Sequence, residues 1–409
     1  MCDTMCALGP GHTLFAKNSD RPISELQLIE AHPRRPGDGS VRITYLQIDD
    51  PGAHAVLAAR PEWMWGFEHG VNEWGVAIGN EEVFTVDKPA DQPPALTGMD
   101  LLRLGLERAR DADEALDVMT ELLTTHGQGG IANQADDLAY FSSFLIADPR
   151  SAWVLETSAR TWAARPVERA ESISNWLTIG TDWTRSSADV ESRADFGGWR
   201  HPTMWRGHAD VRRAATGAAV RRDGPIEAAD LVATLRDHGT GPWGRPLPRG
   251  DASGAVAALP PTDFDPGTGA GFSVCSHLRG WQATTSSIVV DLPGDRSAPI
   301  RAWVAPASPC ASVFVPVFPP DAVPAPLGDP SCIARFGAIA RSVESEGTAR
   351  LEAVRSVFGP LERELWEEAD ALAASDRAAD PRAGATFASS YWPRVEHALD
   401  ILAAADGPS

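Results

Sequence analysis

The order in which two kinds of hydrophobic pattern follow one another constrains the fold most strongly. Residues 12–84 contain short apolar runs with strand character, separated by turn residues. Asn72, Glu73 and Gly75 predict a tight turn into the last of these runs. The opening of the chain is therefore predicted to be mostly sheet, with strands in HTLFAKN, ELQLIEAH, VRITYLQI, HAVLAAR and GVAIGNEEVF.

Helical spacing replaces this pattern after Thr97, which with Asp100 has the form of an N-cap and its partner. A second amphipathic helix is predicted to begin at Asp113 and to end at Gly127. The segments up to residue 238 are predicted as strands at 142–157, 161–167 and 171–182, a mixed helical and loop insertion at 184–225, and a helix at 226–238. A connecting loop or lid is predicted at 239–254, followed by strands at 284–295, 300–308 and 311–318 and by helices at 332–345, 361–375 and 391–405.

This order of sheet, helices, sheet and helices fits two antiparallel sheets covered by helices, and it also fits an α+β fold with an appended helical tail. No run of about 18 apolar residues is present, so no membrane-spanning segment is expected. The formal charge of -20 argues against nucleic acid as a partner. The N-terminus lacks the features of a secretory signal, and a cytoplasmic location is expected.

A cysteine directly follows the initiator methionine, and this is the most informative single position. If Met1 is removed, Cys2 carries a thiol and a free α-amine on one residue. The amine has a reference pKa of roughly 7.7 to 8.0 and the thiol roughly 8.5, so the amine can accept the proton of the thiol. Cys2 is thus a candidate nucleophile that supplies its own base. Cys6, in contrast, is expected to be a small buried side chain.

A lysine and an aspartate follow in FAKNSDRP, where the first strand is expected to end and turn back. Only Lys17 and Lys88 of the 36 basic residues are lysines, so Lys17 is unusual here. Lys17 could lower the pKa of the Cys2 thiol or hold a carboxylate, and Asp20 could orient the α-ammonium. The alternative is an ordinary solvated turn.

The opening MCDTMCALGPGHTLFAKNSDRPISELQ resembles that of secernins and the related bacterial dipeptidases, a family of N-terminal-nucleophile hydrolases. Further similar segments follow in order, among them RPEWMWGFEHGVNEWGVAIGNE, GMDLLRLGLERA, SSFLIADPRSAWVLET and ISNWLTIGTD. The resemblance is dense over residues 2–182 and patchier afterwards. It implies a four-layer α/β/β/α sandwich with two antiparallel sheets, here with a C-terminal helical extension. The catalytic domain is expected at 2–330 and the helical segment, packed on it, at 331–409.

The resemblance also assigns roles to five residues. Cys2 would be the nucleophile, Lys17 and Asp20 would take the basic and acidic positions of related cysteine acylases, and those relatives usually have arginine where Lys17 stands. Asn80 would supply a side-chain amide to an oxyanion hole. Asn175 would place a second amide near the nucleophile. Asn18 and Arg21 are expected to support these residues or to have only turn and surface roles.

Other candidate residues have competing interpretations. Trp63, Trp65 and Trp74 could wall a substrate pocket, although buried packing is the more frequent role of such residues. His277 is expected to be structural. The five cysteines form no CxxC pair and no HExxH motif occurs, so neither a metal nor a cofactor is expected.

The expected activity is the hydrolysis of amide bonds, with a dipeptide as the substrate and no cofactor. Two alternatives stay open at this point: an acylase of non-peptide amides such as penicillins or conjugated bile salts, and a non-catalytic interaction protein of the secernin type. A small-molecule substrate is the expected partner, and a homo-oligomer is possible on these grounds.

Overall fold

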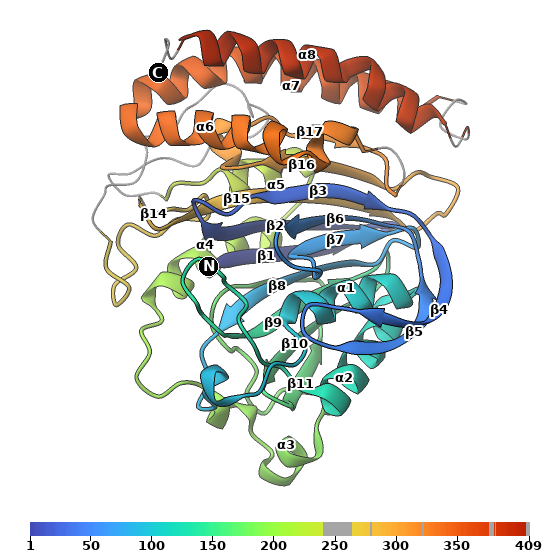
Figure 1. Ribbon diagram of the computed structural model, residues 1–409, viewed down its shortest axis with the longest axis vertical. Coiled ribbons are helices and arrows are strands. Elements are labelled where there is room, and N and C mark those ends of the chain that lie inside the picture. The colour runs from blue at the N-terminus through green and yellow to red at the C-terminus, as the bar shows by residue number, and fades with distance from the viewer. Residues whose placement is uncertain (240–263, 279, 321–322, 376–379, 381, 406–409) are drawn as a thin grey trace.

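Two facing antiparallel sheets form the centre of the molecule in the computed structural model, which describes residues 1–239, 264–278, 280–320, 323–375, 380 and 382–405 (Figure 1). The first sheet has the order β12 (Ala170–Ile173), β1 (Cys2–Gly9), β2 (His12–Pro22), β15 (Gln282–Pro293), β16 (Arg301–Pro306), β17 (Val315–Val317), with β14 (His277–Leu278) paired to β15. The second has the order β13 (Arg185–Ser186), β11 (Thr161–Pro166), β10 (Ala152–Ser158), β9 (Phe141–Ala147), β8 (Ala77–Val83), β7 (His69–Asn72), β6 (Val56–Pro61), β3 (Gln27–His32).

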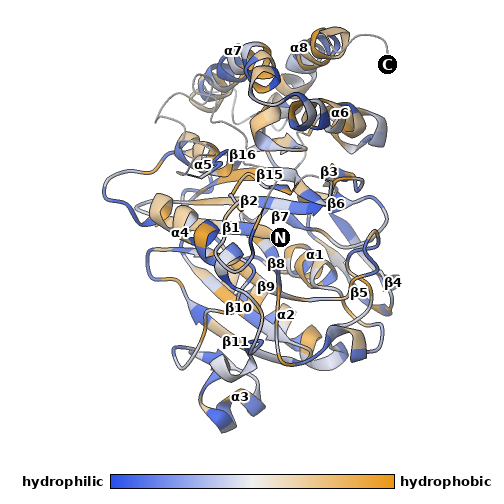
Figure 2. Cartoon of the chain, turned by 90° about the vertical axis from the view of Figure 1, so that its left-hand side faces the viewer, coloured by the Kyte–Doolittle hydropathy of each residue, from blue (hydrophilic) through white to orange (hydrophobic). Residues whose placement is uncertain are grey.

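Helices cover the outer face of each sheet. Those against the second sheet are α1 (Gly98–Arg108) and α2 (Ala112–His126), and those against the first are α4 (Gly207–Arg221) and α5 (Ala228–Leu235). Each interface has its own apolar core, and a third core lies between the sheets (Figure 2). The expected four-layer α/β/β/α sandwich is therefore confirmed.

The C-terminal helices lie along one end of the sandwich, beside β3, β16 and β17 (Figure 1). They are α6 (Pro330–Glu346), α7 (Thr348–Ala373) and α8 (Ala383–Ala405). The last two begin earlier than the predicted starts at Leu361 and Tyr391, and Pro360 and Pro393 both lie inside these helices. The remaining elements are the hairpin β4 (Arg35–Arg42) and β5 (Gln47–Ala53), helix α3 (Ala188–Arg193), and the 3-10 helices η1 (Pro89–Asp91), η2 (Phe196–Trp199), η3 (Pro309–Ala311) and η4 (Ala325–Gly328).

Local capping explains why α1 begins where it was predicted. The Thr97 side chain accepts from the Asp100 backbone N–H, and the Asp100 carboxylate accepts from the Thr97 backbone N–H. The second helix is capped by Asp111, two residues before the predicted start. One predicted strand, 41–48, is wrong at its centre, because the Ile43 N–H bonds to the Leu46 carbonyl and reverses the chain between β4 and β5.

One predicted strand is shorter in the structure, and one predicted loop falls almost entirely outside the described residues. The strand predicted at 311–318 is reduced to β17, since η3 occupies its beginning. The connecting loop or lid predicted at 239–254 lies outside the described residues except for Gly239. Within the described part of the chain, no helix combines the length and the apolar character that crossing a membrane requires.

Candidate active site

The pairing of β1 with β2 brings three of the expected site residues together. Cys2 is opposite Ser19 and Thr4 is opposite Lys17 in an antiparallel register. Directly opposed side chains lie on one face of a sheet, so Lys17 shares the face of Cys2 that looks toward the second sheet. Asp20 lies three residues after Lys17 in β2, so its side chain is on the opposite face of the sheet, toward α4. The expectation that Lys17 and Asp20 occupy a turn is wrong, because both lie within the buried central strand β2.

The backbone amide of Cys2 is held by the side chain of Asn175. The Cys2 N–H donates to Asn175 Oδ1 at 2.9 Å, and the Asn175 amide nitrogen donates to the Glu82 carbonyl at 2.8 Å. Arg212, from α4, donates to the same Asn175 Oδ1 at 2.7 Å and to the Cys2 carbonyl at 3.1 Å. All of these side-chain atoms are buried, so the position of the Cys2 nitrogen is fixed from two sides.

Asp20 presents an unused acceptor on the side of the sheet that α4 covers. Its Oδ1 accepts from Thr284 Oγ1 at 2.7 Å, while its Oδ2 has no hydrogen-bond partner among the described residues and lies 4.0 Å from Arg212 Nη1. Burial raises the pKa of the Asp20 carboxyl, and the N-terminal ammonium and Arg212 oppose this rise. An additional ammonium close to Oδ2 would satisfy the free oxygen.

Lys17 is the positive charge on the thiol side. Burial alone would lower the pKa of Lys17, but Cys2 and Glu68 outweigh it and raise that pKa above its ordinary value. The ammonium lies 3.4 Å from Glu68 Oε2. Burial raises the pKa of the Cys2 thiol, and Lys17 acts against this rise. The geometry therefore gives Lys17 a direct influence on the charge of the thiol.

Asn80 approaches from β8 in the second sheet. With its amide nitrogen toward Glu68, it donates to Glu68 Oε2 at 2.9 Å and to the Glu68 carbonyl at 2.8 Å. Both amide hydrogens are then engaged, so donation to an oxyanion requires that one of these bonds be exchanged. Asn80 and Lys17 thus meet at one carboxylate, which also accepts from Ser19 and Arg21.

A glycine allows the two sheets to approach each other at this point. A Cβ atom on Gly79 would lie 2.7 Å from Lys17 Cδ and 2.8 Å from Thr4 Oγ1. Such distances are shorter than the contact distance of about 3.5 to 4.0 Å between nonbonded carbons. Gly79 is therefore required for the close packing of β8 against Lys17.

Sequence reasoning missed two of the residues in this site, Arg212 and Glu68. Arg212 lies in the insertion at 184–225, which was described only as mixed helix and loop. A signal was present, since His208, Arg212 and Thr216 follow a four-residue spacing and all face the interior. Hydrophobic periodicity cannot detect this face, because its buried side chains are polar.

The three tryptophans that could have walled a substrate pocket do not form one cluster. Trp63 and Trp65 precede β7, whereas Trp74 follows it, so the residues lie at opposite ends of that strand. Trp63 Nε1 donates to Glu25 at 2.8 Å, the Trp65 ring lies 4.0 Å from the Arg103 guanidinium carbon, and the Trp74 ring packs edge-on against His54. All three side chains are only partly buried, and Trp74 also lines a cavity with Arg110 and Arg296, so buried packing alone does not describe them.

Asn18 and Arg21 are both buried in β2, so neither has a surface role. The Asn18 amide donates to the Leu235 carbonyl at 2.9 Å and to the Val274 carbonyl at 2.8 Å. Arg21 pairs with Glu25 at 2.6 Å. They support the strand that carries Lys17 and Asp20.

No family model matches the sequence. Solved structures found by comparison include a mutant of the conjugated bile acid hydrolase from Clostridium perfringens, with a TM-score of 0.43, 13% identity, and coverage of 73% of this chain and 88% of that chain. Penicillin V acylase from Agrobacterium tumefaciens gives a TM-score of 0.42 at 12% identity, covering 78% of this chain and 87% of that chain. The Caenorhabditis elegans ortholog of N-acylethanolamine-hydrolyzing acid amidase gives 0.28 at 10% identity, covering 43% and 71%. Likeness at these identities and TM-scores does not establish a shared activity.

Proposed function

We propose that this protein is a cysteine-dependent hydrolase of amide bonds that acts on dipeptides, with Cys2 as the nucleophile after removal of Met1. The observation that carries the proposal is the buried position of Cys2, whose backbone nitrogen is held by Asn175 and whose side chain shares a sheet face with Lys17. The Cys2 nitrogen donates to Asn175 Oδ1 at 2.9 Å. A free α-amine at that place would keep this acceptor and would carry its own thiol on the same residue.

The proposed reaction uses that amine as the only base. The amine accepts the thiol proton while Sγ attacks the substrate carbonyl carbon, and the oxyanion is stabilised by the Asn80 amide and backbone N–H groups. The C–N bond then breaks, and the ammonium returns the proton to the leaving amine. Water, deprotonated by the same amine, attacks the thioester, the acid leaves, and the thiol regains its proton. Lys17 favours the thiolate form of Cys2 both when the thioester forms and when it is hydrolysed.

The surroundings of Met1 support a dipeptide as the substrate class. The Met1 ammonium donates to the Asp20 carbonyl at 3.3 Å and to Gln282 Oε1 at 3.1 Å. The Met1 side chain packs with Phe272 and Leu278. After Met1 is removed, the N-terminal residue of a dipeptide would find the same acceptors for its ammonium and the same apolar surface for its side chain.

The test compares dipeptides that have free amino termini with the same dipeptides N-acetylated, after intact mass has established that Met1 is absent. We expect hydrolysis of the free dipeptides and a loss of roughly 100-fold or more in Cys2→Ala. Cys6→Ala is the matched control, because Cys6 is buried in the same strand and burial raises its pKa to about 12. Preference for acyl amides without a free ammonium would instead support an acylase.

Two results would overturn the hydrolase proposal altogether. Retention of Met1 in folded protein would leave Cys2 without a free amine. Equal turnover by Cys2→Ala and the unchanged protein would show that the thiol has no part in catalysis, and a partner-binding role would then take precedence.

A further inference from the structure

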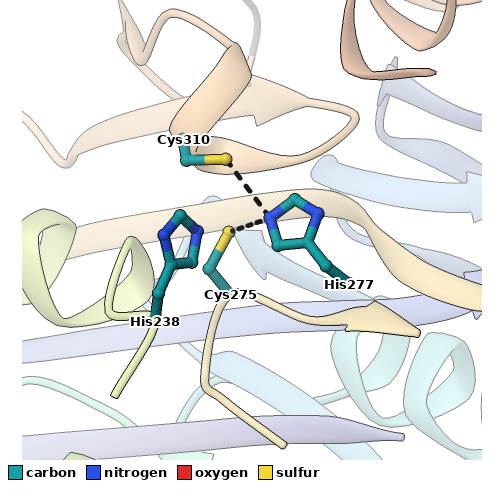
Figure 3. Close-up of side chains that lie close together, drawn as sticks. All are labelled: His238, Cys275, His277 and Cys310. Atoms are coloured by element: carbon teal, nitrogen blue, oxygen red, sulfur yellow. Dashed lines mark hydrogen bonds between the residues drawn. The ribbon is translucent and has the colours of Figure 1, made fainter. Parts of the chain in front are cut away.

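Four metal-ligating side chains converge outside the proposed active site. His238 follows α5, Cys275 precedes β14, His277 lies in β14, and Cys310 lies in η3. Each offers one ligand atom, and these four atoms lie within 4.8 Å of one another. Figure 3 shows the side chains pointing toward a common centre, with His277 Nε2 between the two sulfur atoms.

We propose that these residues bind a structural zinc ion with a Cys2His2 ligand set. The distances from His277 Nε2 to the Sγ atoms of Cys275 and Cys310 are both 3.3 Å. Zinc bonds of about 2.3 Å to sulfur and about 2.0 Å to nitrogen, arranged as a tetrahedron, place such atoms about 3.5 Å apart. The spacing seen here is close to that of a tetrahedral site.

His238 provides the second observation. Its side chain is 1% exposed, and neither of its ring nitrogens has a hydrogen-bond partner among the described residues. Leaving a buried polar group without a partner costs about 1 to 3 kcal/mol. A metal ion at the centre of the cluster would satisfy one of these nitrogens.

The contact of the second ring nitrogen of His277 is also typical of a metal-bound histidine. His277 Nδ1 lies 3.0 Å from Glu344 Oε1 in α6. A carboxylate that accepts from one ring nitrogen orients the other nitrogen toward the metal, as is usual for zinc-bound histidines. Two cysteine thiolates balance the charge of Zn²⁺, and their two protons would be released to solvent on binding.

A catalytic triad made of Cys310, His277 and Glu344 is the main competing interpretation. A triad requires access for substrate, yet Cys275, His277 and Cys310 are 0%, 2% and 5% exposed. It also leaves Cys275 and His238 without a role. The sealed arrangement of four ligands favours a structural metal.

A zinc ion at this place would link three segments of the fold. The Cys275 backbone N–H donates to the Asp237 carbonyl at 3.0 Å, so two ligand segments already touch. Asn18 of β2 donates to carbonyls on both segments, at Leu235 and Val274. The ion would therefore fasten α5, β14 and η3 to one another beside the strand that carries Lys17 and Asp20. No motif predicts this site, since the ligands come from three distant segments.

The experiment is elemental analysis of tag-free, full-length protein purified without chelators from zinc-supplemented cultures. We expect about one zinc per chain, and a background level in His238→Ala, a change that removes a ligand and no described hydrogen bond. Cys332→Ser is the control, because Cys332 is buried in α6 outside the cluster and this variant should keep its zinc. Replacing zinc with Co²⁺ should give the spectrum of a tetrahedral dithiolate site.

A substitution of Glu344, which contacts a ligand without being one, tests the site through its zinc affinity. Glu344→Gln should weaken zinc binding about 10- to 100-fold in competition with a chromophoric chelator. The proposal is overturned if the reduced protein contains no zinc and takes up no Co²⁺. It is also overturned if native protein contains a Cys275–Cys310 disulfide, or if iodoacetamide selectively alkylates Cys310 in the folded protein.

Discussion

The substitution Gly79→Ala tests whether the distance between the two sheets controls the site. The added methyl group would overlap Lys17 Cδ at 2.7 Å and Thr4 Oγ1 at 2.8 Å. Relief requires a shift of about 0.8 to 1.2 Å to reach ordinary contact distances. Lys17 cannot swing away easily, because its side chain is 0% exposed and its ammonium lies beside Glu68.

Two effects of known size follow from that overlap. Overpacking of a core typically lowers the free energy of unfolding by about 1 to 3 kcal/mol. A misplacement of about 1 Å in a catalytic group can reduce turnover about 100-fold. We expect urea unfolding to show that Gly79→Ala lowers the free energy of unfolding by about 1 to 3 kcal/mol. We also expect the rate of dipeptide hydrolysis to fall by more than the loss of folded protein explains.

Gly198→Ala provides the matched control. A Cβ atom on Gly198 would meet no atom within 4 Å, and its backbone is not in the left-handed region. This variant should unfold within about 0.5 kcal/mol of the unchanged protein and should retain its activity. If Gly79→Ala behaves like Gly198→Ala in both assays, the sheets are not held together as the structure indicates.

Two further substitutions test buried carboxylates. Burial raises the pKa of Glu81, which accepts from Thr4, to about 8, so the folded state holds a proton that the unfolded state releases, and stability falls as pH rises from about 4.5 to 8. Glu81→Gln should therefore gain stability relative to the unchanged protein over that range, and a pH-independent difference in urea unfolding would contradict this. Glu362 pairs with Arg236 at 2.8 and 2.6 Å and with Arg355 at 3.4 Å, and Glu362→Gln should lower the free energy of unfolding by about 3 to 5 kcal/mol because it removes a buried negative charge that both guanidinium groups share. Glu364→Gln, on the exposed side of the same helix, should change it by less than about 0.5 kcal/mol, and equal effects would refute the argument.

The layers of the fold could be predicted from sequence because they depend on local patterns. The cap at Thr97 and the turn at Asn72, Glu73 and Gly75 lie where the residue types indicated them. The strand β2 could not be described correctly in the same way. Its segment Lys17–Arg21 has the composition of a turn, and only partners from the second sheet, α4 and β15 allow these polar side chains to be buried.

Contacts between distant segments explain what sequence reasoning missed in the candidate site. Arg212 reaches Cys2 across 210 positions of the chain, and Glu68 meets Lys17 across 51. No short motif records such a pairing. The roles assigned to Asn80 and Asn175 came from resemblance, and both residues lie beside the groups that those roles would need, although their catalytic use stays a prediction.

The two lysines of the chain differ completely in their surroundings. Lys17 is sealed between the sheets, whereas Lys88 lies exposed just before η1. Reagents that acylate side-chain amines should therefore modify the folded protein at a single lysine. Attachment of a dye, a surface or a cross-linker through Lys88 would give every molecule the same orientation, while the appearance of label on Lys17 would report that the sandwich has opened.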